Sequence, residues 1–114
     1  MSVKLTTRQV GDVSVIAANG RITLGEGASQ FRDLIRDLGG KGSKKLLLDL
    51  GDVSYIDSSG IGELVSGFTT VTNQGGQLKL LNLNKRVKDL LQITKLYTVF
   101  EVFDDEADAV RSFS

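Results

Sequence analysis

The N-terminal part of the chain alternates between hydrophobic and polar residues. The alternation covers Val3 to Thr7 and again Val13 to Ala18, and Gly11-Asp12 lies between the two segments. A period of two residues is typical of β-strands, and a short Gly/Asp turn favours a hairpin between them. The sequence therefore predicts an N-terminal β-hairpin.

Farther along the chain, hydrophobic residues follow a helical period. Glu26 to Leu38 carries an apolar stripe with this spacing, and Gly39 and Gly40 directly after it should end the helix. The next segment contains the uninterrupted run Leu46 to Leu48. Such a run suits a strand that is covered on both faces, as in a parallel sheet.

The rest of the chain continues this alternation of helices and strands. The pattern predicts a helix over Ser58–Thr72, a strand over Gln77–Asn82, a helix capped by Asn84, a strand over Thr98–Phe103 and a short helix capped by Asp104, with Ala107 and Val110 facing inward. A hairpin followed by such units predicts an α/β fold, with one domain over residues 1–114, a mixed five-stranded sheet and about four helices.

The segment DLGDVSYIDSSG, Asp49 to Gly60, follows the most apolar predicted strand, and we interpret it as a loop. In open α/β sheets, ligands and partners usually meet the loops at the carboxyl ends of parallel strands. This segment and the helix after it are therefore the first candidates for a functional site.

The predicted helix over Ser58–Thr72 has two faces of different character. Its apolar face, which should lie on the sheet, comprises Ile61, Leu64, Val65, Phe68 and Val71. The opposite face comprises Ser59, Gly62, Glu63, Ser66, Thr69 and Thr70, all small except Glu63. Solvated helix faces normally carry longer charged side chains, so a small polar face favours the close approach of another protein.

Three glycines in this helix need an explanation, because each interior glycine costs a helix about 1 kcal/mol relative to alanine. Gly60 and Gly67 lie on the flanks of the apolar face, where internal packing can require them. Gly62 lies near the middle of the small face, where internal packing explains little. We interpret Gly62 as part of a docking surface.

Three polar residues, Asp57, Ser58 and Ser59, occupy the predicted start of this helix. One of them can cap the free backbone N–H groups there, which is worth about 1 kcal/mol. A hydroxyl is then left over at a place where the helix dipole and free amides tolerate a phosphate. Phosphorylation would add nearly two negative charges to the small face, which would repel a docked partner.

Composition narrows the possible functions. The 114 residues include 14 basic and 14 acidic side chains, so no clustered basic surface points to nucleic acid, and Lys41 to Lys45 is read as a solvated loop. The absence of histidine and cysteine removes the commonest general base, metal ligand and thiol nucleophile. The chain has no signal-peptide pattern and no membrane-spanning apolar run, so we expect a cytoplasmic protein without membrane partners.

Two enzyme-like alternatives fit the sequence less well. A serine hydrolase needs a base beside its nucleophile, and the segment around Ser58 contains neither histidine nor lysine. A phosphoryl-accepting receiver would use aspartates such as Asp49, Asp52 and Asp57, but the first two strands end without acidic pairs to hold magnesium. Capping and turn formation explain these aspartates better.

The same segment resembles the STAS domain of anti-sigma factor antagonists. That family has an apolar strand, here LLLDL from Leu46 to Leu50, followed by the turn DVSYIDSSGIG, here Asp52 to Gly62. The resemblance extends to the N-terminal hairpin and to RVKDLLQITKL from Arg86 to Leu96. It covers nearly the whole chain, and its most specific part is the DSSGIG core.

The resemblance implies a function for the serine after the aspartate, which is Ser58 in this chain. In the family it is phosphorylated by a partner that is both a serine kinase and an anti-sigma factor. The unphosphorylated antagonist binds that partner and releases a sigma factor, and a phosphatase resets the switch. The resemblance thus implies a non-enzymatic protein without its own cofactor, whose partner-binding residues are Asp57, Ser58, Ser59, Gly60, Gly62 and Ser66.

Two positions depart from the family pattern. Many members carry an acidic residue and histidines after the second strand, where this chain has RITLGEG from Arg21 to Gly27. The proline that commonly begins the third helix is Lys85 here, next to the capping Asn84. A non-phosphorylated STAS scaffold subunit of an ABC-type lipid transporter or a larger signalling complex remains the alternative, because fold does not decide function.

Overall fold

The structure is a computed structural model that describes residues 3–23 and 25–113, so Leu24 of the segment from Arg21 to Gly27 lies outside it. The elements in chain order are β1 (Val3–Val10), β2 (Val13–Ile22), α1 (Glu26–Gly40), β3 (Lys45–Ile56), α2 (Ser58–Asn73), β4 (Gln77–Leu81), α3 (Lys85–Ile93), β5 (Val102–Phe103) and α4 (Glu106–Arg111).

These elements form one mixed sheet with the strand order β1-β2-β3-β4-β5. β1 pairs antiparallel with β2 through the turn at Gly11, whose φ of 62° suits a tight hairpin, and the other strands pair in parallel. The predicted α/β fold with five strands and four helices is therefore confirmed.

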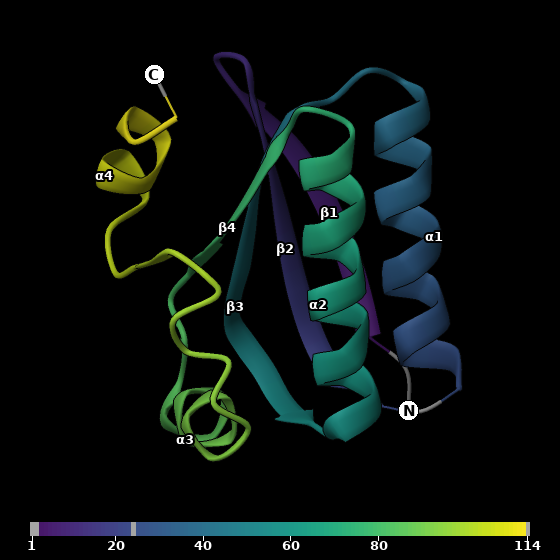
Figure 1. The fold of residues 1–114 in the computed structure, drawn as a ribbon, viewed down its shortest axis with the longest axis vertical. Coiled ribbons are helices and arrows are strands. Elements are labelled where there is room, and N and C mark those ends of the chain that lie inside the picture. Colours follow the sequence, from purple (N-terminus) through teal and green to yellow (C-terminus); the bar gives the residue numbers. More distant parts are fainter. Residues whose placement is uncertain (1–2, 24, 114) are drawn as a thin grey trace.

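Helices cover both faces of the sheet. α1 and α2 stand side by side over one face, and α4 lies on the opposite side (Figure 1). The run Leu46 to Leu48 shows the consequence: Leu46 and Leu48 belong to the main core, whereas Leu47 packs into a second core with Ala109 and Phe113. This arrangement confirms the prediction that the strand is covered on both faces.

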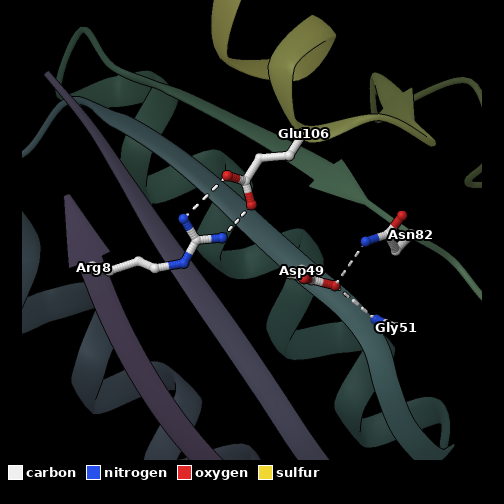
Figure 2. Close-up of polar contacts among 5 residues, drawn as sticks. All are labelled: Arg8, Asp49, Gly51, Asn82 and Glu106. Carbon is white, nitrogen blue, oxygen red and sulfur yellow. Dashed lines mark hydrogen bonds and ion pairs between the residues drawn. The ribbon is translucent and has the colours of Figure 1, made fainter. Parts of the chain in front are cut away.

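The interpretation of Asp49 to Gly60 as a loop is wrong, because β3 continues to Ile56. Its second half pairs with Asn19 to Ile22 of β2 after a register shift. The Asp49 side chain accepts a hydrogen bond from the Gly51 backbone N–H (2.9 Å) and lies 3.4 Å from the Asn82 amide nitrogen (Figure 2). The residues that form this irregularity inside β3 therefore resemble, in the sequence, the end of a strand.

The C-terminal elements also differ from the prediction. The fifth strand comprises only Val102–Phe103, and α4 is capped by Asp105, which accepts from the Asp108 N–H (3.1 Å), instead of by Asp104. With the helix one residue later, Ala109 becomes fully buried and Ala107 is exposed.

Polar contacts hold α4 against the back of the sheet. Lys79 of β4 is buried, and its ammonium donates to the Ser112 backbone oxygen (3.0 Å) and lies 4.6 Å from the centre of the Phe113 ring. At the other edge, Arg8 of β1 pairs with Glu106 (Figure 2), and the hydrogen bond from Arg8 lowers the pKa of the Glu106 carboxyl. The C-terminal helix is thereby tied to both β4 and β1.

Within the described residues, none of the helices combines the length and the apolar character that crossing a membrane requires.

Candidate functional site

The candidate site lies where β3 passes into α2. The strand ends at Ile56, and Asp57 in an extended conformation turns the chain into the helix. The Asp57 side chain accepts a hydrogen bond from the Gly60 N–H (2.8 Å), and its backbone oxygen accepts from the Ile61 N–H (3.0 Å). These bonds confirm that an aspartate caps the helix.

Ser58 is therefore not needed as the cap. It is the first residue of α2, and it is exposed, whereas Ser59 is half-buried. The side chain stands at the positive end of a helix of 16 residues, where a negative group is stabilised. The structure thus leaves an exposed serine, separate from the capping residue, at the start of α2.

The three glycines of α2 have different surroundings. A Cβ at Gly60 would lie 2.2 Å from the Ile22 backbone oxygen, and one at Gly67 would lie 3.3 Å from the Phe31 ring. A Cβ at Gly62 would meet no described atom within 4 Å. Internal packing therefore accounts for Gly60 and Gly67 but gives no reason for Gly62.

The small face of α2 is only partly open to solvent. Gly62, Ser66 and Thr69 are exposed, but Glu63 and Thr70 are half-buried on the side toward α1. The Glu63 carboxylate accepts a hydrogen bond from the Arg32 guanidinium of α1 (3.2 Å) and forms an ion pair with it. Because α1 packs beside α2, only part of the small face that was predicted to favour a docked protein is open to solvent.

Ser58 also lines an open groove of about 750 Å³ that separates the start of α2 from α3. The wall on the strand and α2 side comprises Tyr55, Ile56, Asp57 and Ser58, and the α3 wall comprises Lys85, Arg86, Asp89, Leu90 and Ile93. The α3 wall is basic at its start and apolar at its end, where Ile93 is 76% exposed. The site is therefore bounded by two helices.

Two arginines contact the ring of Tyr55, which lines this groove. The guanidinium carbons of Arg21 and Arg86 lie 5.0 Å and 5.5 Å from the ring centre. Cation–π contacts of this kind are worth about 0.5–1 kcal/mol at exposed sites. They position positive charge near the end of β3, beside the start of α2.

The groove wall on α3 was missed by sequence reasoning. Val87 and Leu91 are buried in the core and Leu90 packs against it, yet the helix also carries the exposed Ile93. That exposed apolar side chain was the signal available in the sequence. Its place in the same groove as Ser58 depends on how α3 packs and could not be predicted from the helical pattern.

Two of the three aspartates of the segment have structural roles, as expected. Asp49 organises the irregularity in β3, Asp57 caps α2, and Asp52 is exposed in β3. Capping and turn formation therefore explain Asp49 and Asp57 without a receiver-type phosphoryl site.

Comparison with known proteins agrees with this geometry. A Thermotoga neapolitana protein named a putative anti-sigma factor antagonist is 33% identical over 102 residues, 89% of each chain. The anti-sigma-B factor antagonist of Bacillus subtilis is 46% identical over 57 residues, 50% of this chain and 52% of that protein. The crystal structure of a putative anti-sigma factor antagonist from Thermotoga maritima superposes on this structure with a TM-score of 0.88. The two sequences are 27% identical, and the superposition covers 96% of this chain and 93% of the other.

The family model of the STAS domain matches residues 4–109, which extend from β1 to the middle of α4. The strand, cap and small-faced helix described above lie inside this match. The chain belongs to the STAS domain family.

Proposed function

We propose that this protein is an anti-sigma factor antagonist whose binding is switched by phosphorylation of Ser58. Its unphosphorylated form binds an anti-sigma factor that is also a serine kinase, and a sigma factor is thereby released. A phosphatase restores the unphosphorylated form. The kinase supplies the ATP and magnesium, so the proposal requires no cofactor on this chain.

The observation that carries the proposal is the exposed Ser58 at the start of α2, in a STAS domain whose relatives are named anti-sigma factor antagonists. Asp57 performs the capping, so the Ser58 hydroxyl is free to be modified without removing the cap. The exposed Gly62 and Ser66 continue the surface from Ser58 along α2. We assign these residues, with Asp57 and the half-buried Ser59, to the docking surface.

Gly60 contributes to this surface in a different way. It is buried against β2, so it sets the position of the first turn of α2 instead of contacting the partner. A phosphoryl group on Ser58 would add about 1.5–2 negative charges at this turn. The helix dipole tolerates that charge within the domain, while a partner that docks closely on the small face would have to desolvate it.

The proposal is tested by incubating the protein with ATP and the candidate kinases of its host and measuring the intact mass. We expect one added phosphate on the wild type and on Ser59→Ala, and none on Ser58→Ala. The Ser59→Ala variant is the matched control, because it removes the neighbouring hydroxyl. Absence of phosphate with every kinase, together with stable copurification with a transporter ATPase, would instead support a scaffold.

A permanent charge at position 58 should weaken partner binding. Ser58→Asp is expected to fold normally and to bind the anti-sigma factor more weakly by about 1–3 kcal/mol, because a charge is placed in the interface. Ser58→Asn introduces a side chain of nearly the same size as aspartate but without its charge, so this variant should bind like the wild type. Calorimetry on the purified pair measures both, and equal affinity of the Asp variant and the wild type would contradict the switch.

A further inference from the structure

The α3 wall of the groove carries two cationic side chains. Lys85 and Arg86, in the first turn of α3, line the same groove as Ser58. Lys85 is 3.2 Å from Asp89 in an ion pair whose side chains are 90% and 52% exposed. Arg86 contacts the Tyr55 ring face. Exposed pairs of these kinds are worth at most about 1 kcal/mol, so a stronger anion can replace them.

We propose that Lys85 and Arg86 bind the phosphoryl group of phosphorylated Ser58 across the groove and so connect the start of α2 to α3. This inference rests on the proposed function, because it concerns the phosphorylated form of the same serine. It gives α3 a role in the switch, because the cations that bind the phosphoryl group come from α3 and not from the small face of α2.

The charges around the groove favour this pairing. Asp57 is engaged with the Gly60 N–H at 2.8 Å, and Asp89 is the other carboxylate on the groove wall. A phosphate dianion carries about twice the charge of Asp89 and three acceptor oxygens. The planar guanidinium of Arg86 can donate two parallel hydrogen bonds to such a group. Arg21, on the same tyrosine ring, adds positive potential nearby.

The pairing would change the docking surface in two ways. The phosphoryl group would occupy the mouth of the groove beside Ser58, and Lys85 and Arg86 would no longer be available to an acidic group of the partner. Phosphorylation would then remove an attractive feature of the surface as well as add a repulsive one. The apolar end of the groove, at Leu90 and Ile93, would be left without its basic flank.

The test uses full-length protein in which phosphoserine is incorporated at position 58 during translation, and follows the ³¹P resonance as a function of pH. The second phosphate pKa of unperturbed phosphoserine is about 6. Because nearby cations favour the dianion, we expect this pKa to be lower by about half a pH unit in the otherwise wild-type protein. Arg86→Gln and Lys85→Gln should each move it back toward the unperturbed value.

Lys88→Gln is the matched control, because Lys88 is on the same helix but is not among the residues that line the groove. It should leave the phosphate pKa unchanged, and Arg86→Lys, which keeps the charge, should retain most of the shift. Circular dichroism verifies that each variant is folded. The same pKa in the wild type, Arg86→Gln, Lys85→Gln and Lys88→Gln would overturn the inference.

This experiment also separates the inference from the proposed function. The phosphate is installed without a kinase and no partner is present, so a negative titration leaves the Ser58 switch intact. Conversely, failure of every host kinase to modify Ser58 would contradict the proposed function but would not alter the titration. Only the pairing of the phosphate with α3 is measured.

Discussion

Gly60→Ala is expected to destabilise the protein by about 3 kcal/mol, toward the upper end of the usual cost of overpacking. The added Cβ would lie 2.2 Å from the Ile22 backbone oxygen and 2.6 Å from Cγ1 of Ile56. Neither neighbour is the end of a flexible side chain, so the start of α2 must move away from β2. Urea unfolding followed by circular dichroism measures the change in the free energy of unfolding.

Gly62→Ala is the matched control for this prediction. The substitution is the same, two residues along the same helix, but the Cβ enters open space. Removing a glycine from an exposed helix position should stabilise the protein by about 0.5–1 kcal/mol. A similar loss of stability in both variants would show that the close contact of Gly60 with β2 is not what requires glycine there.

Gly62→Arg is expected to reduce the affinity for the anti-sigma factor about a hundredfold, which corresponds to about 2.7 kcal/mol. The position is exposed and has open space around it, so the arginine side chain should leave the domain folded, with a melting temperature within a few degrees of the wild type. The lost affinity arises because a long charged side chain prevents close approach to the small face of α2. Calorimetry and thermal unfolding on the same sample separate binding from stability.

Gly40→Arg provides the control for this second prediction. Gly40 is also an exposed helical glycine with open space around it, but it ends α1 at the opposite end of the molecule from the start of α2 (Figure 1). This variant should bind the partner with unchanged affinity. If Gly62→Arg bound equally well, or if it unfolded the domain, Gly62 would not belong to the docking surface as proposed.

Local features of the site could be predicted because they depend on neighbouring residues. Asp57 and Asn84 cap α2 and α3 as expected, each accepting from the N–H three residues later. The exposed position of Ser58 follows from the same reasoning, since a helix start with a separate cap leaves the next hydroxyl outside. The different roles of Gly60 and Gly62 were also indicated by their positions on the helical wheel.

The predictions from sequence were wrong where contacts between residues far apart in the chain decide the structure. The sequence around Gly51 looks like a loop, yet β2 supplies hydrogen-bonding partners that keep the chain in a strand to Ile56. At the C-terminus, Asp104 and Asp105 are equally good caps locally. Packing of Ala109 into the second core selects Asp105, because a helix that began one residue earlier would turn another face toward the sheet.

By itself, the amino-acid sequence determined the order of the elements, the apolar faces of the helices and the cap that leaves Ser58 accessible, since these follow from spacing along one segment. Only the tertiary structure decided that α1 covers the Glu63 side of α2 and that Lys85 and Arg86 of α3 line the groove at Ser58. The physical reason is that side chains from separate helices meet through the packing of each helix on the sheet, which no local periodicity specifies.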